Sequence, residues 1–572
     1  MEYRLDQLDL STLLEEFKVR HNHKPRVLHI GNIANNAYNN AKLFNEHGFD
    51  CDVICPNYYH IMGCPEWEDA EIDGDIGDQF RPDWTRVDLN GFHRPEWFVQ
   101  GPIHLCIKYL YHKRTGNLDK SNKIWETLSV INRTREVGIF RRIYLYSSAL
   151  TDSLWRVLMK ILDPHWVIAT VFRIPVFARA RSFIKKARAE GGRYPGNVVV
   201  RLVNIFINLM ILILSIPLVL INKITGHDKK LKEMVRYLNS CFNELFPDRS
   251  DDIKPVDIGL QVYEKDWWDR LFRHYDFIQG YAVDPIMPML SQVPYFAFEH
   301  GTLRTIPFEK NATGRLTALA YAKAEQVFVT NTDCIANARL LAGERVTVIP
   351  HPFDERRMDN IEGWTELRKQ LCDEIGADLL IFWPTRHDWV KDAGYADKAN
   401  DVFIHAFSRL VKKHNLGIIC CRWGHNVRDS SNLFEKLGCS ERVKWMEPMC
   451  LRKYERMMKA CDVIADQFLL GAFGGVTFRG LAAGRPVCTY LNEDEIKAAY
   501  GEVPPIINCH TVDEITEKLD ALFSSHELRE DMEKKSVVWM KKYHSGTDTA
   551  LKQAACYLRQ SGYSDNHKMN YR

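Results

Sequence analysis

The chain has 572 residues, which at roughly 100–200 residues per domain predicts two to four domains. Its 46% hydrophobic and 11% aromatic content can build large cores and excludes a disordered, collagen-like or small disulfide-stapled protein. The formal net charge of +2 gives no support for a nucleic-acid partner, and none is expected. The 15 cysteines form no CxxC pairs and the first residues show no signal-peptide pattern, which together predict reduced thiols and a cytoplasmic protein.

The first organised stretch predicts a β-α-β unit. Residues 26–31 form a short apolar strand ending in a glycine turn, a helical pattern follows, and residues 49–55 form a second strand. Such a unit opens a doubly wound sheet with its ligand at the carboxyl end of the strand, where Gly31 and Asn32 lie. Backbone N–H groups there can face an anion, although a glycine needed only for the turn is the other reading. The loop is not GxGxxG, so no nicotinamide dinucleotide is indicated.

A stretch rich in aromatic residues and turn signals extends to about residue 125. It contains His60, Glu66 and Trp67, a cluster of the kind that binds a sugar, because a sugar face stacks on tryptophan while its hydroxyls bond to polar side chains. These residues are therefore candidates for the acceptor side of a site. The alternative is that the rings fill a loop-rich core.

A basic segment followed by an apolar one interrupts the α/β pattern within an insertion at about 110–260. Residues 173–201 carry eight Lys or Arg against one Glu, and residues 202–221 are almost wholly apolar. About 20 apolar residues can span a bilayer. However, strand-like segments at 276–280 and 294–298 follow, and one crossing would separate them from the strand at 26–31. We therefore expect residues 173–224 to bind an anionic membrane surface as a peripheral or monotopic element at the inner face. A buried helix of an inserted subdomain is the alternative.

Glu299 and His300 come where the strand at 294–298 ends, followed by a glycine and Arg304. Either side chain could act on a proton or orient a hydroxyl, so both are candidate catalytic residues. A capping or interface histidine is the alternative. Further strands at 326–331 and 345–349 lead to two prolines, which suit a stiff crossover between domains.

A second β/α alternation follows, with strands at 379–383, 416–421, 443–445, 463–465 and 486–490. The fold class predicted is thus α/β, with two doubly wound Rossmann-like domains facing a cleft. Three loops of the second domain carry residues suited to phosphate. They supply Arg386 with Lys391 or Lys398, then Gly424 and His425, and then Gly474, Gly475, Val476 and Thr477 at the start of a helix.

These motifs, in this order along the chain, resemble the GT-B glycosyltransferases of the retaining family-four type. The resemblance covers most of the chain outside roughly 110–260, and includes residues 298–301, 348–352 and 481–486. It implies transfer of a sugar from a nucleotide-diphosphate donor to a lipid-linked or cell-surface glycan, with retention and without a metal or cofactor. By this resemblance Gly31 and Asn32 approach the donor, His300 lies near the cleft, and Arg386 with Lys398 neutralises the leaving diphosphate.

One motif departs from this pattern. The family's Glu-x7-Glu acids would fall on Gly471 and Arg479, so Arg479 is assigned to donor binding with the donor identity open. A nucleotide-sugar epimerase of the same fold and a non-catalytic glycan- or nucleotide-binding partner of another transferase remain as alternatives. We predict an N-terminal acceptor domain over 1–345, a donor domain over 346–540 and a C-terminal helix and tail over 541–572. The helical pattern at 528–558 either crosses back to the first domain or forms a surface helix.

Overall fold

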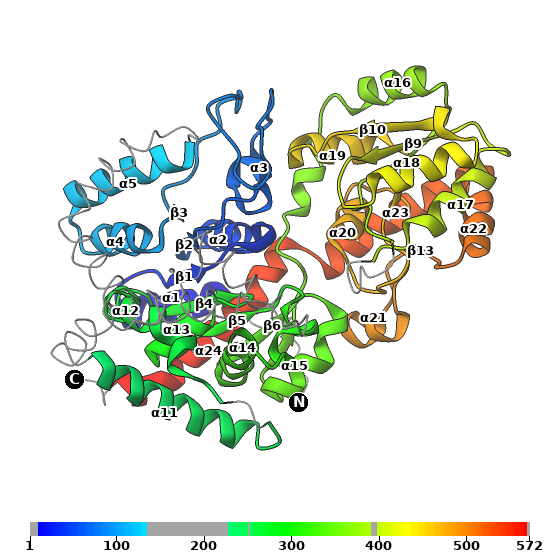
Figure 1. Cartoon of the computed structure of the whole chain (residues 1–572). Coiled ribbons are helices and arrows are strands. Elements are labelled where there is room, and N and C mark those ends of the chain that lie inside the picture. The colour runs from blue at the N-terminus through cyan, green and yellow to red at the C-terminus, as the bar shows by residue number, and fades with distance from the viewer. Residues whose placement is uncertain (1–9, 134–226, 250–251, 391–396, 569–572) are drawn as a thin grey trace, which may run out of the picture.

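The computed structural model describes residues 10–133, 227–249, 252–390 and 397–568 (Figure 1). The segment 173–224, assigned to a membrane surface from the sequence, lies outside the described residues, as does Lys391. The described part contains two parallel sheets with helices on their faces, which confirms the predicted α/β class with two Rossmann-like domains.

The N-terminal domain is built on a seven-stranded parallel sheet in the order β3-β2-β1-β4-β5-β6-β7. Its strands are β1 (Arg26–Ile30), β2 (Asp50–Pro56), β3 (Phe98–Gly101), β4 (Phe277–Tyr281), β5 (Phe296–Phe298), β6 (Gln326–Val329) and β7 (Val346–Val348). Strand β3 was not predicted. The other strands lie within a residue or two of their expected positions, because a parallel strand covered on both faces is a continuous apolar run.

The C-terminal domain is built on a six-stranded sheet in the order β10-β9-β8-β11-β12-β13. Its strands are β8 (Leu379–Trp383), β9 (Leu416–Cys421), β10 (Val443–Met446), β11 (Val463–Ala465), β12 (Val487–Thr489) and β13 (Ile507–Asn508). Every residue of β9 is buried, as expected for a central strand with helices on both sides. The edge strand β13 was not predicted.

Helices cover both sheets. Those of the N-terminal domain are α1 (Leu10–His21), α2 (Asn36–Glu46), α3 (Pro65–Asp69), α4 (Ile103–Arg114), α5 (Leu118–Arg133), α11 (His227–Leu245), α12 (Pro255–Phe272), α13 (Ile286–Ser291), α14 (Ala312–Lys323) and α15 (Ile335–Ala342). Those that follow β7 are α16 (Trp364–Ile375), α17 (Asn400–Leu410), α18 (Val427–Lys436), α19 (Leu451–Ala460), α20 (Gly475–Ala482), α21 (Glu493–Tyr500), α22 (Val512–Ser524), α23 (His526–Tyr543) and α24 (Gly546–Lys568). The described parts of the predicted insertion between β3 and β4 are helical. No helix in the described part of the chain has the length and apolar character needed to cross a membrane.

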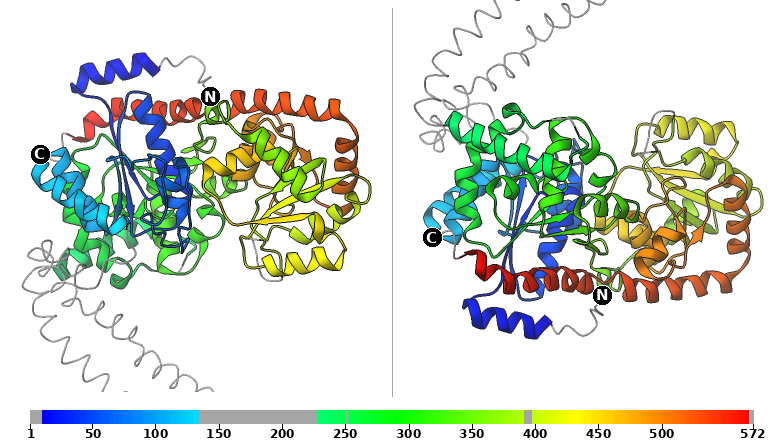
Figure 2. Two further views of the ribbon diagram at one scale, coloured as in Figure 1. Left: turned by 90° about the horizontal axis from the view of Figure 1, so that it is seen from above. Right: turned by 90° about the horizontal axis from the view of Figure 1, so that it is seen from below.

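The last helix of the chain packs against the first sheet. The stretch expected as one helix is two, because His544 leaves the helical conformation and turns into a buried aromatic cluster with Phe473 and Phe478. Figure 2 shows α23 and α24 running along both domains. On α24, Tyr557 is fully buried, stacks on Phe277 at 5.2 Å between ring centroids and donates its hydroxyl hydrogen to Gln279. The N-terminal core therefore includes residues from the far end of the sequence.

Candidate active site

The loop after β1 is held in shape by its own side chains. Gly31 has a φ of +89°, in the left-handed region that favours glycine. The Asn32 side chain is buried: its oxygen accepts a hydrogen bond from the Tyr38 backbone N–H at 2.9 Å, and its nitrogen donates to the Gly63 carbonyl at 3.1 Å. Asn32 thus fixes the loop, while the backbone at Gly31 faces the carboxyl edge of the sheet.

His300, at the end of β5, contacts this loop. Its Nδ1 lies 2.7 Å from the amide nitrogen of Asn36, the first residue of α2. An amide nitrogen only donates, so Nδ1 accepts and the neutral ring carries its proton on Nε2. Burial, together with the nearby charge of Arg304, lowers the pKa of His300 to about 4, which keeps the ring neutral at physiological pH. The structure therefore brings His300 and the β1 loop together.

Glu299 has a supporting position instead. It is fully buried, and its carboxylate accepts hydrogen bonds from the Asn331 amide at 3.1 and 3.3 Å and from the Gly301 backbone N–H. Burial raises the pKa of this carboxyl, although these donors oppose the shift. Glu299 joins the loops after β5 and β6 and so supports the turn that carries His300.

Arg304 is a cation at this edge that the sequence analysis did not select. It forms a bidentate ion pair with Asp333, at 2.5 and 3.0 Å, and keeps partial exposure. Its charge reaches across the domain boundary, because it is one of the cations that lower the pKa of Lys398 in the C-terminal domain. The sequence feature that could have identified Arg304 is a glycine turn followed by an arginine at the end of a strand, directly after His300.

In the C-terminal domain, Lys398 lies beside the ends of β8 and β11. Its Nζ donates to the Gln467 side chain at 2.5 Å. Burial lowers its pKa, the charges of Arg386 and Arg304 act in the same direction, and Asp466 opposes them. A partly buried ammonium near two guanidinium groups is an arrangement suited to an anion of more than one charge.

Asp466 holds together two segments of this part of the site through hydrogen bonds. Its two carboxylate oxygens accept hydrogen bonds from the hydroxyls of Thr385 at 2.9 Å and Thr477 at 2.8 Å. It thereby connects the end of β8 to the first turn of α20, and burial raises its pKa despite these bonds. A Cβ on Gly474 would lie 3.0 Å from the Asp466 carboxylate, so a side chain there would crowd it. Beyond this contact, Gly475 and Val476 open the helix at an exposed and a half-buried position.

A second carboxylate, Asp388, orients the side chains of His425 and Arg386. It accepts a hydrogen bond from the backbone N–H of His425 at 2.8 Å and contacts the ring Nδ1 at 2.9 Å, while Arg386 approaches it at 3.8 Å. Arg386 and His425 remain exposed. Gly424, with a φ of +108°, crosses so close to the His387 backbone that a Cβ would lie 2.6 Å from it. The carboxyl edge of this sheet therefore gathers Arg386, Lys398, Gly424, His425 and the Gly474–Thr477 turn.

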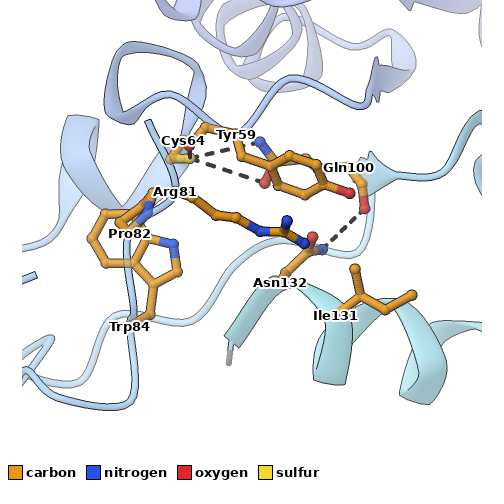
Figure 3. Close-up of a pocket in the computed structure, with 8 residues that line it drawn as sticks. All are labelled: Tyr59, Cys64, Arg81, Pro82, Trp84, Gln100, Ile131 and Asn132. Atoms are coloured by element: carbon orange, nitrogen blue, oxygen red, sulfur yellow. Dashed lines mark hydrogen bonds between the residues drawn. The ribbon is translucent and has the colours of Figure 1, made fainter. Parts of the chain in front are cut away.

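His60, Glu66 and Trp67, the residues proposed for the acceptor side, belong to the segment after β2, which packs against the β1 loop through the Gly63 carbonyl. Glu66 forms a bidentate ion pair with Arg94 at 2.7 and 2.8 Å, and Trp67 is enclosed in a small core. His60 is partly exposed and accepts a hydrogen bond from the backbone of its own turn. Other side chains of this region line a hollow at the ends of β2 and β3, where Arg81 lies 5.3 Å above the Tyr59 ring (Figure 3).

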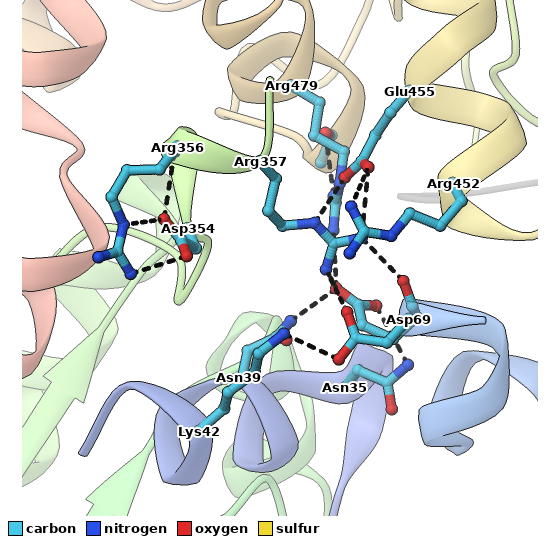
Figure 4. Close-up of polar contacts among 12 residues, drawn as sticks. Asn35, Asn39, Lys42, Asp69, Asp354, Arg356, Arg357, Arg452, Glu455 and Arg479 are labelled. Carbon is cyan, nitrogen blue, oxygen red and sulfur yellow. Dashed lines mark hydrogen bonds and ion pairs between the residues drawn. The ribbon is translucent and has the colours of Figure 1, made fainter. Parts of the chain in front are cut away.

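Arg479 contacts both the turn after Gly474, where it donates to the Gly475 carbonyl at 3.2 Å, and the other domain. Its guanidinium lies 3.9 Å from Glu68 of α3 and stacks over Phe478. The same interface holds Arg357, from the short helix η7 (Glu355–Met358), between Asp69 at 2.8 Å and Glu455 of α19 at 3.0 Å (Figure 4). In the described part of the chain no group of His, Cys, Asp and Glu could hold a metal ion, and all 15 cysteines are free thiols.

Comparison with solved structures finds partial likenesses at low identity. The Anabaena protein Alr3699/HepE in complex with UDP and glucose is 15% identical with a TM-score of 0.43, over 52% of this chain and 82% of that chain. Sucrose-phosphate synthase from Thermosynechococcus elongatus is 12% identical with a TM-score of 0.42, over 54% and 78%. WaaG, a glycosyltransferase involved in lipopolysaccharide biosynthesis, is 17% identical with a TM-score of 0.36, over 51% and 81%. No protein-family model and no curated protein sequence matches the chain.

Proposed function

We propose that the protein is a glycosyltransferase that moves a sugar from a nucleotide-diphosphate donor to a hydroxyl of a glycan. The observation that carries the proposal is the group of cations beside the N-terminus of α20 at the carboxyl edge of the second sheet. Arg386 is exposed there, Lys398 is half-buried beside it, and the first turn of α20 begins at Gly475. Such an edge suits a diphosphate, because guanidinium, ammonium and helix N-terminal N–H groups all favour negative charge.

The same groups give a reason for catalysis. When the bond between the sugar and the diphosphate breaks, negative charge grows on the leaving diphosphate. Cations that are already in place stabilise this charge more in the transition state than in the bound donor. Arg386 and Lys398 are held by Asp388 and Gln467, so neither cation has to be reordered during the reaction.

The N-terminal domain would hold the sugar and its acceptor. His300 is neutral and carries its proton on Nε2, so it can donate a hydrogen bond to a sugar hydroxyl without competing for the diphosphate. Arg304 lies on the same side of the site, since its charge is one of those that lower the pKa of Lys398. Retention of configuration follows only from the family resemblance, and comparison of the anomeric signals of donor and product by NMR tests it.

The test begins with the donor. Nucleotide sugars are screened for thermal stabilisation, since a ligand of the folded state raises the melting temperature. With the best donor, Arg386→Ala is expected to lose most turnover while it stays folded, because the transition-state charge loses a partner. Arg409→Ala is the matched control, since Arg409, near the C-terminal end of α17, forms an exposed ion pair with Asp513 of α22. Wild-type turnover by Arg386→Ala would contradict the proposal.

Two other activities give different products in the same assay. An epimerase changes the nucleotide sugar without any acceptor. A non-catalytic binding partner shows donor stabilisation without turnover, and the replacement of the acidic motif by Gly471 and Arg479 is the sequence feature that favours it. Product analysis with and without a glycan acceptor separates the three.

The acceptor is proposed to be lipid-linked or at the cell surface, reached from the inner face of the membrane. The support is the sequence of residues 173–224, with its basic segment beside an apolar one. The test is co-sedimentation of the full chain and of a variant lacking 173–224 with vesicles containing phosphatidylglycerol. Equal sedimentation of the two proteins would refute membrane binding by this segment.

A further inference from the structure

Asp284 lies at the place in the first sheet where the strand order reverses. From β1 the chain passes to β2 and β3 on one side, and then returns to β4 on the other side of β1. The loops after β1 and β4 therefore separate at this point, which is where open α/β sheets bind ligands. Asp284 follows β4 by three residues, and Gly31 follows β1 directly.

The carboxyl of Asp284 lies directly against Gly31. A Cβ added to Gly31 would lie 2.1 Å from Oδ2 and 3.0 Å from Cγ of Asp284. Any residue other than glycine at position 31 would therefore displace this carboxyl, in addition to the strain that its φ of +89° imposes. The close approach of the two loops depends on the absence of a side chain at Gly31.

The Asp284 carboxyl differs from the other acids at this edge. Glu299 is bonded to Asn331, and Asp333 to Arg304. For Asp284, no residue in the described ranges gives a hydrogen bond or ion pair to the carboxylate, and burial alone raises its pKa to about 7. The residue nevertheless keeps partial exposure. A partly buried carboxylate without a hydrogen-bonding partner has an unfavourable desolvation energy. A hydrogen-bond donor on a bound ligand would reduce that energy.

The surroundings favour a hydroxyl as that donor. The titratable groups that face Asp284 are the Cys55 thiol of β2 and the Tyr321 hydroxyl of α14, and burial holds the pKa of each above its usual value. Both are therefore uncharged at neutral pH, and among the described residues no group of acids, histidines and cysteines could hold a cation at Asp284. The neighbouring strand β5 leads to His300, so a ligand at Asp284 lies between the β1 loop and the proposed sugar site.

We propose that the Asp284 carboxylate binds and orients the acceptor hydroxyl to which the sugar is transferred. This assignment rests on the proposed glycosyltransferase function and adds the residue that receives the acceptor. A charge-assisted hydrogen bond from the hydroxyl to the carboxylate fixes the direction of its oxygen lone pairs. Such fixed orientation converts a chance encounter into a reaction between positioned groups.

The test uses the full chain, the nucleotide sugar that stabilises it best, and water as the smallest hydroxyl acceptor. Release of the nucleotide is followed for the wild type, Asp284→Asn and Asp284→Ser. The control is Asp276→Asn, at the opposite end of β4, where Asp276 accepts a hydrogen bond from the Arg26 backbone N–H that an asparagine oxygen can also accept. Thermal stabilisation by the donor is measured for each protein.

Both Asp284 variants are expected to lower the rate of release at least about tenfold, as for loss of a hydrogen bond to a charged group, with donor stabilisation unchanged. The wild-type rate should fall as the pH decreases through about 7, and this fall should be missing in Asp284→Asn. Wild-type rates in both variants, or loss of donor stabilisation equal to the loss of rate, would overturn the assignment. If no nucleotide sugar stabilises the wild type, the proposed function itself fails, and the assignment of Asp284 with it.

Discussion

Replacement of Arg357 tests how the two domains are held together. Its guanidinium is 6% exposed and contacts Asp69 at 2.8 Å, the Glu68 carbonyl at 2.8 Å and Glu455 at 3.0 Å. It therefore joins α3 of one domain to α19 of the other (Figure 4). In Arg357→Met the side chain keeps much of its volume, but the buried carboxylates lose their shared cation.

The expected cost is about 3–5 kcal/mol of unfolding free energy, the usual result of removing one partner from a buried ion pair. Arg356→Met is the matched control. Arg356 is the adjacent residue and also links the domains, through Glu46, but it is 54% exposed, so its loss should cost no more than about 1 kcal/mol. Urea unfolding followed by tryptophan fluorescence compares the two variants with the wild type.

The effect should depend on pH. Burial raises the pKa of Glu455, and Arg357 opposes this shift. Burial also acts to raise the pKa of Asp69, but Arg357 and Lys42 together hold it below the usual value. Without Arg357 both carboxyls would bind protons more readily in the folded state, so the deficit of the variant should shrink as the pH falls from neutral towards the unfolded carboxyl pKa of about 4.

A buried thiol reports whether the domains separate before they unfold. Cys450 comes from the C-terminal domain but packs in the small core with Ile61 and Trp84 of the N-terminal domain. Alkylation of Cys450, followed by mass spectrometry, should be faster in Arg357→Met than in Arg356→Met. Equal unfolding free energies and equal Cys450 labelling in the two variants would refute the role of Arg357.

The remaining predictions concern the first sheet. Tyr557→Ala should lower the free energy of unfolding by about 3–5 kcal/mol, because it empties a fully buried position among Phe44, Phe277 and Phe296. Tyr557→Phe should lower it by about 1 kcal/mol, because only the hydrogen bond of the hydroxyl is lost. Urea unfolding measures both effects. Gly31→Ala should lower the melting temperature, because the added Cβ collides with Asp284. Gly77→Ala is the control, since Gly77 also has a positive φ, of +74°, but has open space around it. An equally large decrease in Gly77→Ala would show that backbone strain alone is responsible. Asp284→Asn should raise the melting temperature at neutral and alkaline pH, because burial raises the pKa of this carboxyl to about 7 and its ionised form destabilises the fold. The increase should disappear as the pH falls towards about 4, the pKa of the unfolded carboxyl. An increase that does not depend on pH would contradict this prediction.

The parts of the site that the sequence predicts well are those at strand ends. Arg386 follows β8 and the Gly474 turn follows β11, and parallel strands place their carboxyl ends at one edge. Their proximity therefore follows from the pattern of strands alone. Strands β3 and β13 are harder to predict, because they are short and lie next to turns, so their apolar runs are weak.

Side-chain partners could not be predicted in this way. Glu66 and Trp67 have the composition of a sugar site, but a distant arginine, Arg94, neutralises the acid, and neighbouring loops cover the ring. Arg479 stands where the family pattern has an acid, and its guanidinium faces Glu68 from the other domain. Asp284 carries no motif, and only its approach to Gly31 in three dimensions singles it out.

The position of α24 has a consequence for synthesis of the chain. The face of the first sheet that carries Phe277 and Phe296 is completed by Tyr557, which is synthesised only after the whole second domain. The first domain would therefore emerge with an uncovered apolar surface and keep it while the whole second domain is made. Such long-range closure slows folding, and it exposes the nascent protein to aggregation or to chaperones until α24 arrives.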